Sequence, residues 1–341
     1  MMTSRQIVQR TLRFEQPDRL AVQFDLLGRS DVGGVGFAMP EGLVGTGTGV
    51  DPWGCRWQQS EVANMGQVKG HPLTDLAAVD DYPMPDYRAD HWYAHIPDDL
   101  ARHEDNEVYV TAGIFMVLFE RMHSLCGFEA VLAGLLADRP AMERLADRVT
   151  DVHVELVRQY SARFGRRIQG ISMTDDWGTQ QAAFVSPELW NDFFAPRYRR
   201  LFDTMHAAGY DVWLHSCGKV NDLIEGFIDV GVDVVNLQQP RALGIESIGD
   251  RYRGRITFSS LADIQATLPT GRADLIAADA EALATHWMTP EGGFVFSDYG
   301  DGAAIGASDQ AKRTMYDSFS RISERLYGHA LPEPRTPEEV Q

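Results

Sequence analysis

A histidine and a cysteine stand two residues apart at the end of a buried hydrophobic run. Residues 211–214 read as a strand, and His215 and Cys217 follow where that strand would end. Side chains two residues apart on a strand point to the same face, so the imidazole and the thiol are expected to converge. Imidazole nitrogen and thiolate sulfur are both ligands of zinc. The pair therefore predicts half of a metal site, whose other ligands must come from elsewhere in the chain.

The segments around this pair alternate between strand-like and helix-like patterns. Strands are predicted at residues 20–25, 53–58, 107–113, 169–176, 211–214, 232–239, 256–260 and 292–297. Helices are predicted at residues 140–165, 186–209 (broken or kinked at Pro196), 220–229, 245–252, 273–287 and 308–327. Uninterrupted strand–helix repeats favour a parallel sheet, and eight strands predict an α/β fold with a single (β/α)₈ TIM barrel. Such barrels keep their chemistry at the carboxyl ends of the strands, where His215 and Cys217 fall.

One domain is expected over residues 1–328, with an irregular first part at residues 1–105 and a loose tail at residues 329–341. The stretch from Asp31 to Gly49 is rich in glycine. A phosphate-binding loop is disfavoured there, because Pro52 and Trp53 follow where a helix should begin. We therefore expect a mobile loop over the barrel mouth.

Composition narrows the class of partner. The 341 residues carry 49 acidic and 31 basic side chains, a net charge of −18, which argues against nucleic-acid binding. No apolar run is long enough to span a membrane, and the N-terminal residues lack the apolar core of a signal peptide. Three cysteines in so long a chain do not form a disulfide framework, so a cytoplasmic location is expected.

Other side chains at predicted strand ends are candidates for the site. Asp175 and Asp176 end one strand, and only one of them can face the barrel axis, as ligand, base or substrate anchor. Glu120 is expected at the mouth as a catalytic residue. Further substrate-binding candidates are Trp53 and Trp177, as walls of an apolar pocket, and Gln238, as a hydrogen-bonding group. Histidines away from the predicted strand ends, such as His153, are expected at the surface.

Several segments, taken in order, resemble the uroporphyrinogen decarboxylase superfamily, and the resemblance covers nearly the whole chain. Residues 12–22 and the pair Gly28-Arg29 resemble its opening helix, first strand and arginine-bearing loop. The segments that resemble its methyltransferase-like branch are Asp51–Cys55, Phe119–Arg121, Thr174–Gln180, His215–Gly218 and Gly292–Phe294. The resemblance implies a TIM barrel of the uroporphyrinogen decarboxylase type.

This superfamily contains two chemistries. Its decarboxylases use no metal and hold a polyanionic tetrapyrrole with arginines, one of which lies three residues before the Gly-Arg pair. That position is Asp25 here, which would repel a propionate, although Arg29 remains. The corrinoid and coenzyme M methyltransferases use zinc to activate a thiol, with ligands of the form His-x-Cys plus a distant cysteine. The resemblance therefore favours the methyltransferase branch, with Asp25 and Arg29 at the substrate site.

The distant cysteine of those methyltransferases has no counterpart in this chain. After the last predicted strand, Tyr299 or a neighbour stands in its place, which makes Tyr299 a candidate catalytic residue. Asp298 is the favoured third metal ligand, since its carboxylate supplies a harder oxygen donor. The alternatives for that ligand are Asp301, Asp175 and Asp176.

These residues favour an enzyme that uses zinc to transfer a methyl group from or to a small methylated substrate. A thiol, a corrinoid carrier protein or tetrahydrofolate would be the other methyl carrier, and the resemblance is compatible with a homodimer. One alternative is cofactor-independent decarboxylation of a pyrrole- or aromatic-carboxylate. There, Asp51, Asp175 or Asp176 would stabilise a protonated intermediate, and Arg29 would anchor the carboxylate. The other alternative is a catalytically idle paralogue that binds a small molecule.

Overall fold

Eight parallel strands form a nearly closed barrel in the computed structural model, which describes residues 2–24, 30–40, 43, 47–59 and 66–334. The barrel strands are β1 (Ala21–Gln23), β2 (Val32–Val35), β6 (Tyr109–Ile114), β7 (Gly170–Thr174), β8 (Asp211–His215), β9 (Val234–Asn236), β10 (Thr257–Ser260) and β11 (Phe294–Ser297). Their spatial order is β1, β11, β10, β9, β8, β7, β6, β2. The backbone N–H of Asp31 donates to the Val22 carbonyl at 2.7 Å, between β1 and β2. The predicted (β/α)₈ barrel is confirmed.

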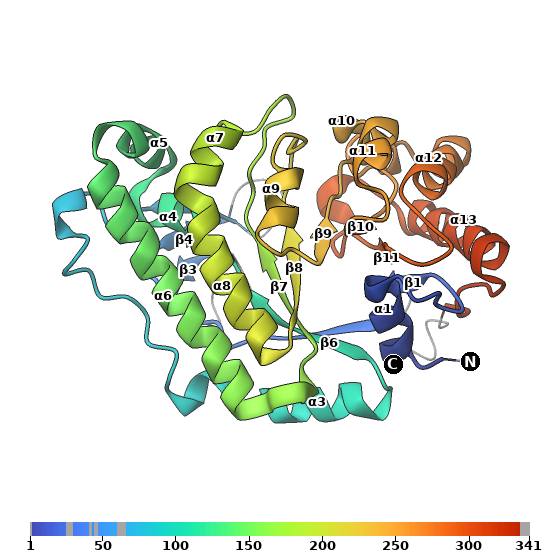
Figure 1. Ribbon diagram of the computed structural model, residues 1–341, viewed down its shortest axis with the longest axis horizontal. Coiled ribbons are helices and arrows are strands. Elements are labelled where there is room, and N and C mark those ends of the chain that lie inside the picture. Colours follow the sequence, from blue (N-terminus) through green and yellow to red (C-terminus); the bar gives the residue numbers. More distant parts are fainter. Residues whose placement is uncertain (1, 25–29, 41–42, 44–46, 60–65, 335–341) are drawn as a thin grey trace.

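Helices surround the barrel (Figure 1). They are α1 (Ser4–Arg13), α3 (Ile96–Asp105), α4 (Phe119–Cys126), α5 (Phe128–Ala137), α6 (Arg139–Phe164), α7 (Pro187–Leu189), α8 (Ala195–Ala208), α9 (Ile224–Asp229), α10 (Pro240–Leu243), α11 (Ile245–Tyr252), α12 (Ala273–His286) and α13 (Asp309–Tyr327). Short 3₁₀ turns lie at Leu76–Ala78, Asp90–Tyr93, Gly165–Arg167, Leu268–Thr270 and Ala303–Ile305. Helix α6 packs against α8, and α12 packs against α13 (Figure 1). None of the described helices has the length and apolar character needed to cross a membrane.

Helix α1 covers the amino end of the barrel. Thr3 caps this helix by accepting a hydrogen bond from the Gln6 N–H, and the Gln6 side chain accepts one from the Thr3 N–H in return. The apolar face of α1 packs in a separate buried cluster with residues from the barrel strands. That cluster contains Ile7, Val8, Leu12, Ala21, Val32, Tyr109, Trp213, Val234 and Val295. A ligand can therefore be received at the opposite end, where the strands finish.

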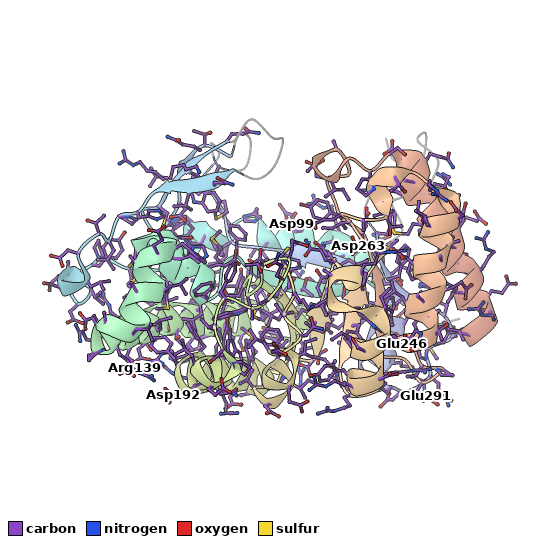
Figure 2. The ribbon with its side chains drawn as sticks, turned by 90° about the horizontal axis from the view of Figure 1, so that it is seen from above. Asp99, Arg139, Asp192, Glu246, Asp263 and Glu291 are labelled. Carbon is purple, nitrogen blue, oxygen red and sulfur yellow. The ribbon has the colours of Figure 1, made fainter. Side chains whose placement is uncertain are left out.

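The first hundred residues differ from the expectation. Residues 53–58 do not form a barrel strand: β4 (Arg56–Gln58) belongs to a separate antiparallel sheet with β3 (Gly49–Val50) and β5 (Gln67–Gly70). Figure 2 shows this small sheet standing to one side of the barrel. The eighth barrel strand is β2, inside the glycine-rich stretch that was predicted to be a loop. Glycine is needed there because a Cβ on Gly33 would lie 2.4 Å from the His103 ring of α3.

Pro196 is predicted to break or kink its helix, and the structure has an irregular turn just before this proline rather than a break. Residues Trp190–Phe194 form a π-helical turn between α7 and α8, and the Ala195 N–H donates to the Trp190 carbonyl. A π turn has a wider hydrogen-bond spacing than an α-helix, which gives the proline ring room without an end to the helix.

The described part of the C-terminal segment packs on α13. Leu331 is buried, and its N–H donates to the Ser320 Oγ at 3.1 Å. The Tyr316 hydroxyl donates to the Pro332 carbonyl at 2.6 Å. Residues 329–334 are thus held against the barrel rather than forming the start of a loose tail.

Candidate metal and substrate site

His215 and Cys217 converge at the carboxyl end of the barrel, as their spacing predicted. Along β8, Val212 and Leu214 are fully buried against the outer layer, whereas Trp213 and His215 line the cavity inside the barrel. The Nε2 atom of His215 lies 3.3 Å from the Sγ atom of Cys217.

Asp176 brings a carboxylate to the same point from the end of β7. Its Oδ1 accepts a hydrogen bond from the Cys217 N–H at 2.8 Å and lies 3.6 Å from the His215 Nε2. One donor atom from each of these three residues lies within 4.8 Å of the other two. No other group of three such residues occurs in the part of the chain that the structure describes. Nitrogen, sulfur and oxygen donors at this spacing fit a tetrahedral zinc site with one open position.

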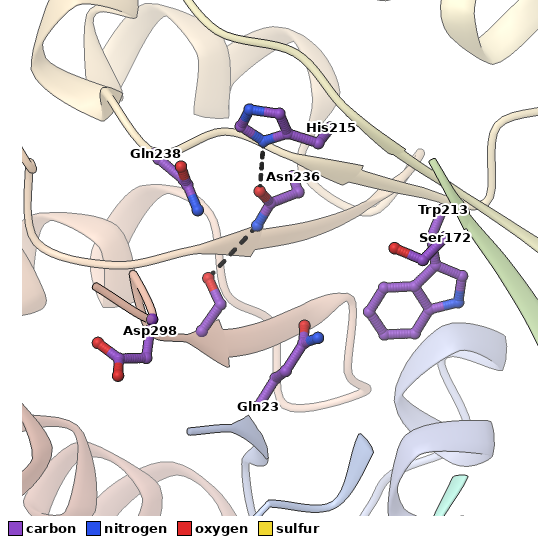
Figure 3. A pocket seen from close by; sticks show the side chains of 9 residues that line it. Gln23, Ser172, Trp213, His215, Asn236, Gln238 and Asp298 are labelled. Carbon is purple, nitrogen blue, oxygen red and sulfur yellow. Dashed lines mark hydrogen bonds between the residues drawn. The ribbon is translucent and has the colours of Figure 1, made fainter. Parts of the chain in front are cut away.

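Asn236 orients the His215 ring from the neighbouring strand (Figure 3). The Asn236 amide nitrogen donates to the Ser259 carbonyl at 3.1 Å and to the Ser259 Oγ at 2.9 Å. A carbonyl only accepts, so the Asn236 Oδ1 must face His215, whose Nδ1 lies 2.7 Å away and donates to it. The proton is therefore on Nδ1, and the Nε2 lone pair points toward Cys217 and Asp176. Sequence reasoning missed Asn236, although β9 places it beside His215 in register.

A cavity of about 730 Å³ opens beside this trio. It is lined by Phe115, Glu120, Thr174, Asp176, His215, Cys217, Asn236, Gln238, Tyr299, Gly300, Asp301 and Ala304. An adjoining space of about 360 Å³ is mostly apolar, with Phe37, Met39, Ile114, Phe115 and Met173 in its wall. A smaller one of about 140 Å³ lies deeper and is lined by polar side chains such as Gln23, Gln238 and Ser297 (Figure 3). His215 borders all three spaces.

Glu120 faces this cavity from the first turn of α4, as predicted for a residue at the mouth. Its side chain is only 9% exposed, and its Oε2 has no hydrogen-bond partner among the described residues. Burial raises the pKa of Glu120 well above its usual range, and the carboxylates of Asp176 and Asp175 raise it further. Burial likewise raises the pKa of the Cys217 thiol, with Asp176 and Glu120 adding to the effect.

Asp175 points away from the cavity, as the strand alternation requires for the neighbour of Asp176. Its carboxylate accepts from the backbone N–H groups of Leu118, Phe119 and Glu120 at 2.7–3.0 Å, and from the Tyr198 hydroxyl. Burial raises the pKa of Asp175 to about 6, and these hydrogen bonds oppose the rise. Asp175 thus holds the N-terminus of α4 and does not line the cavity, which leaves Asp176 as the member of the pair that faces it.

Trp53 lies in the packed interior rather than in the pocket wall. Asp51 accepts from the Trp53 N–H at 3.0 Å and pairs with the Arg121 guanidinium at 2.8 Å, and the guanidinium carbon lies 4.9 Å from the centre of the Trp53 ring. Trp177, the other tryptophan predicted to wall the pocket, does not line it either. It is fully buried and stacks on Phe119 at 4.6 Å between ring centres. Both tryptophans therefore support the elements behind the site.

The loop after β11 carries two further candidates, Tyr299 and Asp298, and only Tyr299 lines the main cavity. Burial raises the pKa of Tyr299, with Cys217 adding to the rise. Asp298, the favoured third ligand from the sequence, lies outside the trio: its Oδ2 accepts from the buried Lys312 ammonium at 3.0 Å. Asp176 occupies the place that Asp298 was expected to take.

Two predicted substrate-binding residues, Asp25 and Arg29, lie outside the described residues. Gln238 lines the main cavity and the deeper space, consistent in position with a hydrogen bond to a ligand. His153, expected at the surface, is instead buried beside Trp53, with 5.3 Å between the ring centres.

Residues 62–252, more than half of the chain, match the uroporphyrinogen decarboxylase (URO-D) family. The chain belongs to the URO-D family. This match includes all three residues of the trio, and the barrel is the fold that the resemblance implied. No curated protein matches the sequence.

One solved structure supports the same fold for this URO-D family chain. A methyltransferase from Methanosarcina mazei superposes with a TM-score of 0.70 and 14% sequence identity, over 94% of this chain and 99% of the other. A D-psicose 3-epimerase from Clostridium cellulolyticum H10 gives a TM-score of 0.40 and 13% identity, over 74% and 85% of the two chains. At 14% sequence identity, the similarity to the methyltransferase shows only that the two proteins share a fold.

Proposed function

We propose that this URO-D family member is a zinc-assisted methyltransferase that moves a methyl group between a small methylated substrate and a second carrier. The observation that carries the proposal is the trio of Asp176, His215 and Cys217 beside the cavity. The Asn236 contact adds to it, because the orientation of His215 leaves Nε2 available as a ligand atom. The methyltransferase from Methanosarcina mazei, whose fold is similar, is consistent with a methyl-transfer reaction.

Each residue of the site has a task in this proposal. Asp176, His215 and Cys217 would hold the ion, and Asn236 keeps the His215 tautomer and ring orientation. A bound zinc ion supplies Lewis acidity, which favours the deprotonated form of a thiol. The walls of the cavity align the methyl carbon with the attacking atom and exclude water, which is the main requirement of an in-line displacement.

The second methyl carrier is part of the proposal. A small thiol suits the chemistry of the site, and a corrinoid carrier protein or tetrahydrofolate are the other carriers that the family resemblance suggests. We also propose that the substrate is a small molecule and that the protein acts as a homodimer in the cytoplasm.

Decarboxylation without a cofactor receives less support from the contacts. Of the carboxylates considered for it, Asp51 is bound by Arg121 and by the Trp57 indole N–H, and Asp175 is bound by the start of α4. Asp176 faces the cavity, but it lies against His215 and the Cys217 N–H. Two of the three carboxylates are thus committed to holding the fold.

Elemental analysis with a matched cysteine control tests the proposal. Protein purified without chelator should contain close to one zinc per chain, and Cys217→Ala should lose it while the barrel stays folded. Cys126→Ala is the control, since Cys126 is a buried cysteine outside the trio and should leave the zinc content unchanged. With methylcobalamin as donor and 2-mercaptoethanol as acceptor, wild type and Cys126→Ala should form the methyl thioether and Cys217→Ala should not. A metal-free wild type with full activity would contradict the zinc assignment.

A further inference from the structure

The walls of the main cavity hold carboxylic acids and no lysine or arginine among the described residues. Glu120, Asp176 and Asp301 are its carboxylic acids. No lysine or arginine lines this cavity or either adjoining space within the described chain. A carboxylate or phosphate substrate would find no cationic partner in these walls, whereas a cation would be attracted by ionised carboxylates and would favour the charged form of Glu120.

Two cationic side chains lie close to the cavity, and both are turned to other partners. Arg121 follows Glu120 in the chain, but it pairs with Asp51 at 2.8 Å. The Lys312 ammonium is 1% exposed and donates to Asp298, to the Tyr299 carbonyl at 2.6 Å and to the Gly300 carbonyl at 3.3 Å. Neither is free to bind an anionic ligand in the cavity, and no other lysine or arginine of the described residues lines it.

Glu120 supplies an acceptor that the protein leaves without a partner. Its side chain is more than nine-tenths buried and lines the main cavity, and its Oε2 receives no hydrogen bond from the described residues. Its carboxyl group interacts with the Thr174 side chain and the Asp176 backbone, which fixes its orientation. A buried polar atom without a partner is costly, and its presence points to a ligand that compensates for it.

Other lining residues suit methyl groups. Phe115 and Tyr299 line the main cavity, and Phe115 continues into the apolar space beside Phe37 and Met39. Aromatic faces attract a cation through the ring quadrupole, and apolar surface accepts the methyl groups that surround such a cation. Carboxylic acids and aromatic rings in the walls of one cavity are the two elements that a pocket for a methylated cation requires.

We propose that the main cavity binds a small organic onium cation, with methyl groups on a positively charged nitrogen or sulfur, and that Glu120 is its counter-charge. This inference rests on the proposed function and names the substrate class of the same site. In the transfer, a thiolate sulfur attacks one methyl carbon with its lone pair. The bond from that carbon to nitrogen or sulfur breaks, its electron pair stays on the heteroatom, and a neutral amine or thioether leaves. The charges balance without a proton or an oxidant.

Calorimetric titration of the zinc-loaded full chain with three ligands of one shape tests the inference. Choline carries the positive charge, 3,3-dimethyl-1-butanol replaces its nitrogen by carbon, and 3,3-dimethylbutanoate carries a negative charge. Choline should bind about tenfold or more tightly than the neutral alcohol, and the carboxylate should bind most weakly. Glu120→Gln keeps the shape of the side chain and should bring choline down to the affinity of the alcohol. Glu129→Gln, on the exposed face of α5, is the matched control and should change neither.

A second variant guards against a misfolded Glu120→Gln protein. Tyr299→Leu should reduce the preference for choline over the alcohol, and Tyr299→Phe should retain it, because the ring is the element that attracts the cation. Equal binding of choline and the alcohol by wild type, or tightest binding of the carboxylate, would overturn the inference.

The nature of the charged atom is decided in a transfer assay. Choline and (2-hydroxyethyl)dimethylsulfonium are offered as donors with 2-mercaptoethanol as acceptor, and the donor that yields the methyl thioether identifies nitrogen or sulfur. Charge-selective binding that depends on Glu120 supports the inference even in a preparation that transfers no methyl group. Absence of transfer from every donor counts instead against the proposed methyltransferase reaction, so the two failures are distinguishable.

Discussion

Replacing Asn236 by alanine removes the contact that holds the Nδ1 side of the His215 ring. The wild-type amide is anchored at both ends, by the 2.7 Å contact with His215 and by its bonds to Ser259. Without it, the ring can rotate or carry its proton on Nε2, the atom that faces Cys217 and Asp176. The variant therefore has to reorder the histidine before a metal ion can bind.

The size of the effect follows from the role of this contact. Loss of a partner that orients a metal-ligating histidine costs about 10–100-fold in metal affinity, or about 1.4–2.7 kcal/mol. Asn236 borders the deeper space of the cavity, so water can replace part of the lost hydrogen bond. We therefore expect Asn236→Ala to bind zinc about tenfold to thirtyfold more weakly than wild type.

Competition against a chromogenic zinc chelator measures this affinity directly, without a substrate. Asn221→Ala is the matched control, since its amide donates to the Leu243 carbonyl at 2.6 Å and lies outside the cavity walls. This control should bind zinc like wild type, and thermal unfolding should show both variants folded. Zinc affinity of Asn236→Ala within about threefold of wild type would refute the reasoning, because the Asn236 contact would then not orient His215 for the metal.

Two further predictions concern stability. Lys312→Met leaves the buried Asp298 carboxylate without its cation and should lower the free energy of unfolding by roughly 3–5 kcal/mol in urea denaturation. Adding Asp298→Asn should recover part of that loss; no recovery would contradict the pairing. Burial lowers the pKa of His153 to about 3, so the unfolded chain gains a proton near pH 6.5 that the folded chain does not. Stability is therefore complete above about pH 6.5 and falls below it by up to about 1.4 kcal/mol per pH unit. His153→Phe, which keeps a ring against Trp53, should reduce the slope between about pH 6.5 and 5 in urea titrations; an unchanged slope would exclude His153 as its source.

The later strands could be predicted closely from the sequence, whereas the second one could not. Runs such as Gly170–Thr174 and Asp211–His215 are buried on both sides and separated by amphipathic helices, so hydrophobic pattern alone places them. Val32–Val35 contains two glycines and lacks that pattern. Gly33 is required because the His103 ring leaves no room for a Cβ atom at this position. His103 is far away in the sequence, so this contact cannot be predicted from the residues around Gly33.

In the site, too, features set by a single strand could be predicted, whereas contacts between distant segments could not. Convergence of His215 and Cys217 follows from the two-residue period of one strand, and the opposite directions of Asp175 and Asp176 follow from the same rule. Asn236 required the register between two strands. The pairing of Asp298 required knowledge of where α13 packs, since Lys312 lies 14 residues away.

The segments that resembled the family prove to be connected through α4. Asp51 holds Arg121 from the side of the small sheet, and Asp175 holds the first N–H groups of the helix from the end of β7. Glu120 stands between these two anchors and turns the other way, into the cavity. A carboxylate oxygen kept buried without a partner, as the Glu120 Oε2 is among the described residues, needs a rigid backbone, because a mobile one would let it reach water. Two buried anchors at the first turn of α4 provide that rigidity, so Asp51 and Asp175 fix where Glu120 points.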